Sequence, residues 1–489
     1  MRRHPHLYEI SAWPWLERLS ARENRRVTLA DVPGATWDAL AQAGIDCVYL
    51  MGVWKRSAVG RLMARTDVNL IAEYERVLPG WEMRDVPSSP YCIQAYEPDD
   101  RMGGWSGLDR TRADLASRGM ALMLDFVPNH TGLDHDWIRT NPEYYVEGTL
   151  DNYRAEPSLY HPVESAGGSV VRFIACGRDP FFPPWRDVAQ LNYFNPATRE
   201  AMIGVLETIA QHCDGVRCDM AMLVVNDVFA QTWAGRVDLL WNMPATEFWP
   251  EATRRAPMTY LAEVYWDREY QLQQQGFDYT YDKRLLDRLY HGDASETRAH
   301  LMADPGYSAR LARFLENHDE ARSVAAFGHR IRAAAALTFT LPGLRFFFDG
   351  QFEGAHLRAP VQLGRWPANP DRPDIRDLYS RLLKAIDVPL FHDGNRSLLN
   401  VQGAGDTTNT DLIALAWRKG SDLAVVAANI TDHDAQGLLE IGELPAGDAF
   451  ELKDRLSDET YHWTRADLAN GLYVRLGSGG AHLLVFKGA

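Results

Sequence analysis

The sequence repeats one pattern through most of its length: a helical stretch, a short stop, and an apolar run of strand length. In the clearest copy, residues 35–43 form the helical stretch, with Trp37 and Leu40 on one face. Gly44 follows as a typical helix stop, and residues 45–51 are an almost continuous apolar run. Such a short run predicts a strand that is buried on both faces, as in a parallel sheet.

Eight apolar runs can be assigned to strands in this way. They cover residues 7–10, 45–51, 120–126, 215–219, 258–264, 277–281, 312–316 and 343–348. Eight buried strands alternating with helices predict a closed (β/α)₈ TIM barrel. A doubly wound open sheet is the alternative, although no Gly-x-Gly-x-x-Gly turn follows the first strand and no P-loop is visible.

Two regions do not follow the alternation. Residues 131–188 are rich in Pro, Gly, Asn and aromatic residues without a long period, which predicts a loop-rich subdomain inserted after the third strand. Residues 392–489 carry short alternating runs separated by turn residues, which predicts a C-terminal antiparallel β-sandwich. The barrel itself is then expected to comprise residues 1–130 and 189–391.

Composition limits the partners and the location. The formal net charge of −15 and the pI near 5.5 disfavour a nucleic-acid partner and suit a neutral substrate. No run of about 18 apolar residues predicts a membrane span, and no apolar segment follows the first basic residues as in a signal peptide. Five scattered cysteines predict reduced, buried thiols in a cytoplasmic protein. The sequence does not indicate an oligomeric state.

Polar residues stand at the ends of four predicted strands, where barrel enzymes carry their working residues. They are Asp125, Asn129 and His130 after the third strand, Arg217 and Asp219 at the fourth, Glu263 at the fifth, and His318 and Asp319 after the seventh. Carboxylates gathered at one mouth repel one another, so their grouping needs a purpose. Glycoside hydrolysis supplies one, because it uses one carboxylate as nucleophile and a second as proton donor.

Arg217 stands two residues before Asp219, so both side chains leave the same face of a strand. A permanent cation beside a carboxylate favours the ionised form that a nucleophile needs. A buried ion pair that only secures a strand end is the alternative interpretation of these two residues taken alone.

Four short segments, in order, resemble the conserved regions of the α-amylase family of retaining glycoside hydrolases. They are residues 125–130, residues 215–219, Glu263 with its strand, and residues 316–319. Gln190-Leu191-Asn192 and Leu341-Pro342-Gly343 also resemble family segments. The likeness spans about residues 7–391, and the predicted sandwich matches the C-terminal domain of the family.

The resemblance implies roles for particular residues. Asp219 would be the nucleophile, Glu263 the general acid and later the base, and Asp319 the carboxylate that stabilises the transition state. Four residues would bind substrate: Arg217, which also keeps Asp219 charged, His130 and His318, which would hydrogen-bond the sugar, and Tyr91, which would stack on it. Asp125 is expected to be a structural partner of Arg217. Trp54, Trp185 and Trp266 are either core residues or further stacking platforms.

The chain also departs from the family pattern. Cys92 and Ala95 replace two frequent aspartates, and Met222 and Leu223 stand where starch-degrading relatives often carry Lys-His. The resemblance therefore implies a small α-linked, glucose-containing substrate rather than a long glucan. It disfavours a calcium requirement, although Asn129 matches a calcium-binding position of many relatives. We expect no other cofactor and no metal ion bound by side chains of the protein.

Three other readings remain open at this point. The same three carboxylates can serve a transglycosylase or a sugar phosphorylase if a sugar or phosphate replaces water as the acceptor. A catalytically silent relative that only binds carbohydrate is a further alternative, as the fold alone does not exclude it. An unrelated metal-dependent barrel enzyme is the last, although His130 and His318 do not stand at metal-ligand spacing.

Overall fold

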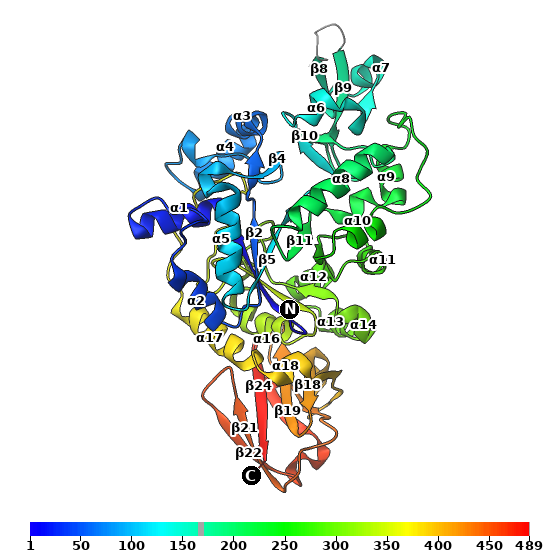
Figure 1. The fold of residues 1–489 in the computed structure, drawn as a ribbon. Coiled ribbons are helices and arrows are strands. Elements are labelled where there is room, and N and C mark those ends of the chain that lie inside the picture. The colour runs from blue at the N-terminus through cyan, green and yellow to red at the C-terminus, as the bar shows by residue number, and fades with distance from the viewer. Residues whose placement is uncertain (165–170, 489) are drawn as a thin grey trace.

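The structure, a computed structural model, describes residues 1–164 and 171–488, and its centre is a closed barrel of eight parallel strands (Figure 1). Around the barrel the strands follow the order β1-β15-β14-β13-β12-β11-β5-β2. Their bounds are β1 His6–Ser11, β2 Cys47–Met51, β5 Ala121–Phe126, β11 Gly215–Cys218, β12 Thr259–Ala262, β13 Tyr279–Tyr281, β14 Leu311–Arg313 and β15 Leu344–Phe348. The predicted (β/α)₈ barrel is confirmed, and the open-sheet alternative is wrong.

Helices cover the outside of the barrel, and their ends follow sequence signals. For α8, the Asn195 side chain accepts a hydrogen bond from the Ala197 amide and Pro196 occupies the first turn, so the helix begins there. The helices are α1 Ala12–Glu23, α2 Gly34–Gln42, α3 Ala58–Thr66, α4 Val68–Val77, α5 Gly104–Ala116, α8 Pro196–Ile209, α9 Asn226–Trp233, α10 Trp249–Arg255, α11 Glu269–Gln274, α12 Lys283–His291, α13 Ala294–Leu301, α14 Pro305–Ser308, α15 Ser323–Phe327, α16 Ile331–Phe339, α17 Pro373–Ile386 and α18 Pro389–Asp393.

The insertion after β5 is more ordered than its sequence predicts. It contains an antiparallel sheet of order β6-β10-β9-β7, with β8 paired to β9. Its elements are β6 His130–Gly132, α6 Trp137–Thr140, β7 Glu147–Gly148, α7 Leu150–Ala155, β8 Tyr160–Glu164, β9 Val171–Gly177 and β10 Trp185–Gln190. The strands are short, and a bulge interrupts the pairing of β9 with β10, which explains why no regular period is visible. A two-stranded sheet of β3 (Trp54–Arg56) and β4 (Ile93–Pro98) lies in the loop after β2.

The C-terminal region is built from antiparallel sheets, as predicted. A six-stranded sheet has the order β16-β18-β19-β24-β21-β22, and a three-stranded sheet has the order β17-β20-β23. Their bounds are β16 Asn395–Leu398, β17 Val401–Gln402, β18 Leu412–Lys419, β19 Asp422–Asn429, β20 Ala435–Leu439, β21 Ala449–Asp454, β22 Thr460–Thr464, β23 Leu472–Leu476 and β24 Ala481–Gly488. Trp417 of β18 donates its indole N–H to the Thr340 carbonyl, 2.7 Å away, at the end of α16.

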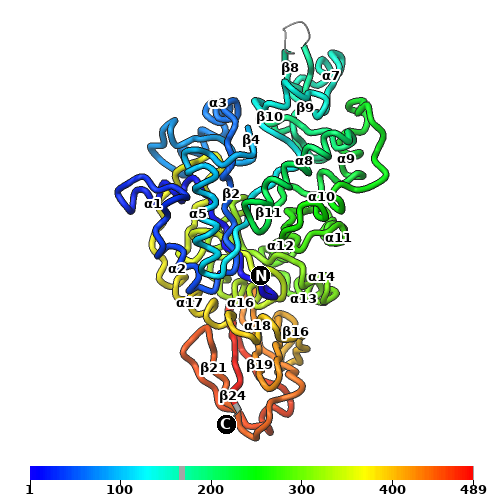
Figure 2. The backbone as a smooth tube through the Cα atoms, viewed as in Figure 1, coloured from blue at the N-terminus to red at the C-terminus, as the bar shows by residue number. Residues whose placement is uncertain are grey.

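The insertion and the sandwich lie at opposite ends of the molecule (Figure 2). The insertion follows the carboxyl end of β5, so it flanks the mouth of the barrel where catalytic residues are expected. All five cysteines are free and buried. No helix in the part of the chain that the structure describes is long and apolar enough to cross a membrane.

Candidate active site

Arg217 holds two of the predicted catalytic carboxyl groups together at the barrel mouth. Its Nη1 atom lies 2.8 Å from Asp219 Oδ1, and its Nη2 atom lies 2.8 Å from Glu263 Oε2. Arg217 is completely buried and both carboxyl groups are nearly so. Since one guanidinium contacts both groups, the two carboxyl groups must lie close to each other. Short separations of this kind are typical of the carboxyl pair in retaining glycosidases.

Parallel strand pairing places these side chains side by side. β11 lies between β5 and β12 in the barrel, and Arg217 is in register with Leu261 of β12. The pairing continues past the strand ends: the Asp219 amide donates to the Phe126 carbonyl, and the Ala221 amide donates to the Glu263 carbonyl. Asp219 and Glu263 are therefore fixed by the backbone of neighbouring strands rather than by mobile loops.

Met220 adopts a left-handed backbone conformation, with φ 41° and ψ 47°, directly after Asp219. This conformation is unfavourable for a side chain without a special reason. Here the Met220 amide donates to Glu263 Oε2 over 2.8 Å. The strained turn therefore joins the end of β11 to the carboxyl group on the next strand.

The surroundings of Glu263 favour the protonated form of its carboxyl group, as a proton donor requires. Burial raises the pKa of Glu263 to about 7; the Arg217 charge opposes this shift, while Asp219 and Asp319 add to it. Burial also raises the pKa of Asp219, but Arg217 counteracts it through its charge and a direct hydrogen bond. Asp219 therefore ionises first of the pair, and Glu263 keeps its proton near neutral pH.

Asp319 and His318 form a second cluster with Tyr91. His318 Nε2 lies 2.7 Å from the Tyr91 hydroxyl and 2.9 Å from Asp319 Oδ2, while Nδ1 lies 2.5 Å from Glu9 Oε1. Burial disfavours a charged imidazole, yet Asp319 and Glu9 outweigh it and raise the pKa of His318 well above its ordinary value. The Asp319 side chain is 47% exposed, so it faces the open mouth.

Tyr91 connects the two clusters. The Arg217 guanidinium carbon lies 5.2 Å from the centre of the Tyr91 ring, a cation–π distance, and the Tyr91 hydroxyl contacts His318. The structure thus brings together six of the seven predicted site residues: Asp219, Glu263, Asp319, Arg217, His318 and Tyr91.

His130, the seventh predicted site residue, lies in the first strand of the insertion. It is buried in β6, where its Nδ1 atom lies 3.3 Å from the Asn129 amide nitrogen and its ring packs edge-on against Trp185. Burial lowers the pKa of His130 to about 4, so the ring is neutral. The hydrogen bonds and ion pairs of the described residues do not connect its side chain directly to Asp219, Glu263 or Asp319.

Asp125 is structural, and its hydrogen-bond partners are residues other than Arg217. Its carboxyl group accepts hydrogen bonds from the Tyr49 hydroxyl and from the Gly52 amide, the latter over 2.6 Å. Asp125 and Arg217 are neighbours in register across β5 and β11; burial raises the pKa of Asp125, and the Arg217 charge opposes this shift. The carboxyl group thus anchors the chain at the end of β2.

The remaining sequence candidates divide between core and surface. Trp54 is fully buried and donates to the Asp125 carbonyl, so it is a core residue. Trp266 lines a surface groove with Met220 and Tyr265, which both donate hydrogen bonds to the Glu263 carboxyl group, whereas Trp185 packs against His130.

Three residues that depart from the family pattern are buried. Met222 and Leu223 lie inside the short 3₁₀ turn Ala221–Val224, and Cys92 is also fully buried. They pack the core and present no side chain to a ligand.

Sequence reasoning missed two residues of the site. Tyr265 donates its hydroxyl hydrogen to Glu263 Oε1 over 2.9 Å, and Glu9 holds the inner nitrogen of His318. The sequence contains a signal for each residue. Tyr265 stands two residues after Glu263, a spacing that places both side chains on the same side of an extended chain. Glu9 is a single acid inside the first apolar strand. An acid in such a strand needs a buried partner.

The arrangement is suited to acid–base and nucleophilic chemistry at a sugar. Calcium is less easily placed: the Asn129 and Gln190 amides hydrogen-bond each other over 2.9 and 3.2 Å, so the Asn129 side chain already has a partner. Within residues 1–164 and 171–488, no group of three His, Cys, Asp or Glu side chains is placed to hold a metal ion. Independence from calcium stays a prediction.

Comparisons with known proteins agree with this geometry. The family model for the α-amylase catalytic domain matches residues 40–360. "Alpha-amylase 3" of Dictyoglomus thermophilum is 24% identical over 307 residues, which is 59% of this chain and 58% of that protein. The "Palatinase" of Erwinia rhapontici is 24% identical over 309 residues, 53% of this chain and 54% of the relative. The chain thus aligns with little more than half the length of these curated relatives.

A solved structure extends the likeness to the whole fold. The maltogenic α-amylase AmyB of Thermotoga neapolitana superposes with a TM-score of 0.68 at 18% identity, covering 99% of this chain and 98% of the other. The family model covers well over half of the 489 residues. This chain belongs to the α-amylase family, whose members are glycoside hydrolases and transglycosylases.

Proposed function

We propose that this protein is a retaining glycosidase that hydrolyses α-glycosidic, chiefly α-glucosidic, bonds in small oligosaccharides or glucosides. The observation that carries the proposal is the Arg217 bridge, which sets Asp219 and Glu263 within reach of one guanidinium at the ends of adjacent strands. Asp219 is the nucleophile, Glu263 the acid and then the base, and Asp319 the carboxylate that stabilises positive charge in the transition state.

In the first half of the reaction, Glu263 gives its proton to the glycosidic oxygen while Asp219 attacks the anomeric carbon. The proton resides best on Oε1, because Oε2 already accepts the Met220 amide and contacts Arg217. The Tyr265 hydroxyl, 2.9 Å from Oε1, positions this oxygen toward the leaving group. The bond between sugar and leaving group breaks, and a covalent glycosyl ester forms on Asp219.

In the second half, the ionised Glu263 takes a proton from water, and the resulting hydroxide attacks the anomeric carbon and releases Asp219. The developing positive charge on the sugar is stabilised by Asp319, whose pKa is held below its ordinary value chiefly by the charge of His318, against the effect of burial. Two displacements at the same carbon retain the anomeric configuration.

Arg217, His318 and Tyr91 bind and orient the sugar in this proposal, and His130 is proposed to hydrogen-bond it from the start of β6. Small substrates are supported by the buried Met222 and Leu223, which replace polar residues that could hold a sugar beyond the cleaved bond. A cytoplasmic location is proposed from the five free, buried thiols.

The test is a panel of α-glucosides, α-linked disaccharides and short α-glucans, incubated with and without inorganic phosphate and followed by proton NMR. The proposal expects free sugar with the α-anomer formed first. A β-anomer as first product, or no reaction with any α-linked substrate, would contradict it. A sugar phosphate or a longer oligosaccharide as main product would instead identify phosphorolysis or transglycosylation.

Two variants assign the roles. Asp219→Asn and Glu263→Gln should each lower kcat at least a thousandfold, because each removes a group that changes bonding in the reaction. Glu75→Gln, at an exposed position of α4, is the matched control and should leave activity unchanged. Near-normal turnover by either site variant would refute the assignment.

A further inference from the structure

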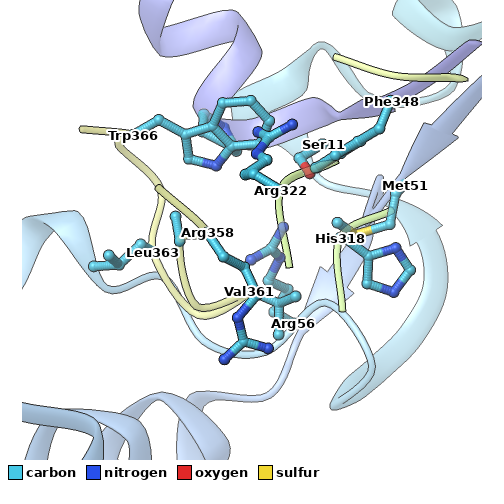
Figure 3. A pocket seen from close by; sticks show the side chains of 12 residues that line it. Ser11, Met51, Arg56, His318, Arg322, Phe348, Arg358, Val361, Leu363 and Trp366 are labelled. Atoms are coloured by element: carbon cyan, nitrogen blue, oxygen red, sulfur yellow. The ribbon is translucent and has the colours of Figure 1, made fainter. Parts of the chain in front are cut away.

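A narrow pocket opens beside His318 at the barrel mouth (Figure 3). It is formed at the ends of four strands: Ser11 of β1, Met51 of β2, His318 after β14 and Phe348 of β15 contribute to its wall. Three arginines complete it: Arg56, Arg322 and Arg358. None of the described residues that line it is an aspartate or a glutamate.

Arg56 is the most unusual of the three arginines. It is only 8% exposed, and its guanidinium donates to the main-chain carbonyls of Ser88, over 2.7 Å, and Gly52, over 3.3 Å. Among the described residues, no carboxylate lies within 4 Å of it, and its buried Nε atom has no hydrogen-bond partner. A buried arginine without an acid is costly, so it requires an explanation.

Arg322 is held rigidly on the opposite side of the pocket. Its guanidinium carbon lies 4.2 Å from the Phe348 ring centre and 5.1 Å from the Trp366 ring centre. Nη1 donates to Glu316 over 2.7 Å, but the buried Nε atom again has no partner. Nη1 also donates to the Asp349 carbonyl over 2.9 Å, so the side chain is fixed by stacking, by one ion pair and by one hydrogen bond to the main chain.

Arg358 connects the pocket with the catalytic cluster. Its Nη1 atom donates to the Asp319 carbonyl over 2.9 Å, and Nη2 reaches Glu73 on α4 over 3.1 Å. At 42% exposed, its side chain lies at the rim. The pocket therefore adjoins Asp319 and His318 directly.

We propose that this pocket binds an oxyanion carried by the glycone, so that the substrate is an α-glycoside with a phosphate, sulfonate or carboxylate group. Guanidinium groups bind such oxyanions through paired N–H donors, and three arginines, with no carboxylate among the described lining residues, surround this pocket. The inference rests on the proposed function, since it names the substrate class of that same site.

The position of the pocket decides which half of the substrate carries the charge. β1, at the pocket, lies four places from β12 in the eight-stranded ring, so Glu263 is on the opposite wall. Glu263 protonates the leaving group, which must therefore lie on its side. A group bound in the pocket, whose wall includes His318, therefore belongs to the glycone rather than to the leaving group.

This placement distinguishes an anionic glycone from phosphate as the attacking acceptor. An acceptor must approach the anomeric carbon from the side that the leaving group has vacated, next to Glu263. Phosphate held by Arg56 would lie at the wrong end of the sugar. The net charge of −15 does not oppose the proposal, because the lining of the pocket is locally cationic.

The test compares 4-nitrophenyl α-glucoside with its 6-phosphate, its 6-sulfonate analogue and the corresponding uronide. At least one anionic substrate should show a kcat/KM at least tenfold above that of the neutral glucoside, and the preferred group identifies the natural oxyanion. Arg56→Gln should reduce this preference at least tenfold. Lys55→Gln is the matched control, because its ammonium pairs with Glu97 on the surface, and it should leave the preference unchanged.

Folding is checked by melting temperature, and Arg358→Gln at the rim should also reduce the preference if Arg56→Gln fails to fold. Preference for the neutral glucoside, or a preference that Arg56→Gln and Arg358→Gln do not alter, would overturn the inference. If every glycoside is inert, the proposed function fails and inorganic phosphate becomes the probe. Saturable phosphate binding that Arg56→Gln or Arg358→Gln weakens then supports the pocket, and its absence overturns it.

Discussion

Replacing Glu263 with glutamine should stabilise the protein at alkaline pH while it abolishes turnover. The carboxyl group is 4% exposed, and its pKa is raised to about 7 from an ordinary value of 4.5. A raised carboxyl pKa means that the folded protein holds a proton that the unfolded chain releases. Folding is therefore penalised once the pH exceeds the unfolded pKa.

The size of the effect follows from the shift. Between pH 4.5 and 7 the unfolded chain has lost the Glu263 proton and the folded protein retains it, so stability falls by about 1.4 kcal/mol per pH unit. The full penalty above pH 7 is about 3 kcal/mol, from a shift of 2.5 pH units. Glutamine has no such penalty, although Arg217 loses one of its two acids and offsets part of the gain.

The assay is urea or thermal unfolding of wild type, Glu263→Gln and the surface control Glu75→Gln at half-unit steps from pH 4.5 to 8. The stability difference between Glu263→Gln and wild type should grow in favour of the variant by about 3 kcal/mol across this range. The control should show a flat difference. A Glu263→Gln difference that is flat, or that grows in favour of wild type, would refute the buried, protonated state of Glu263.

Four further predictions concern activity. kcat/KM should fall tenfold per pH unit above about pH 7 as Glu263 loses its proton, which a pH–rate profile measures. Tyr265→Phe removes a hydrogen-bond donor to the Glu263 carboxylate, so the fall of kcat/KM at alkaline pH should begin at a higher pH. Tyr270→Phe, at an exposed position, should leave the profile unchanged. An unchanged profile in Tyr265→Phe would contradict a role for the hydrogen bond between Tyr265 and Glu263. Glu9→Gln removes the charge behind His318 and should lower kcat/KM roughly tenfold, in line with the net worth of a charge-assisted hydrogen bond. Chelation should change neither activity nor melting temperature, and a large loss of either would show a metal requirement.

The barrel could be predicted because its strands are buried on both faces. Each strand is then an apolar run that stands out from the amphipathic helices around it, and eight such runs leave few alternatives. Asp219 and Glu263 could be placed because each directly follows a barrel strand, where the backbone fixes its direction, whereas Asp319 lies in the loop after β14 and was placed by its resemblance to a family segment. Most of the predicted site residues therefore come from segments that follow a barrel strand.

The insertion and Asp125 show where this reasoning stops. The sheet of the insertion is made of short strands with a bulge, so its residues show no period and were predicted to be mainly loop. Asp125 was assigned to Arg217 from proximity on adjacent strands, but Tyr49 and the Gly52 amide are closer. The register of paired strands determines which residues lie near each other. Side-chain rotamers and the amides of nearby loops determine which of these residues form hydrogen bonds.

The arginine pocket could not be predicted at all. Arg56 follows the second strand, Arg322 follows the seventh, and Arg358 lies in the loop after the eighth. No spacing in the sequence connects these three residues, because only the closure of the barrel brings β2, β14 and β15 to one side of the mouth. The overall negative charge pointed instead to a neutral substrate.

The central claim is that Asp219 forms a covalent bond with the sugar. Glu263→Gln should still react with an activated glycosyl fluoride, which needs little acid assistance, but should release the sugar slowly for want of a base. After denaturation and trypsin digestion, mass spectrometry should find one added glycosyl unit on the peptide Cys218–Arg236, at Asp219. An unmodified peptide despite single-turnover release of fluoride, or a glycosyl unit on another residue, would contradict the mechanism.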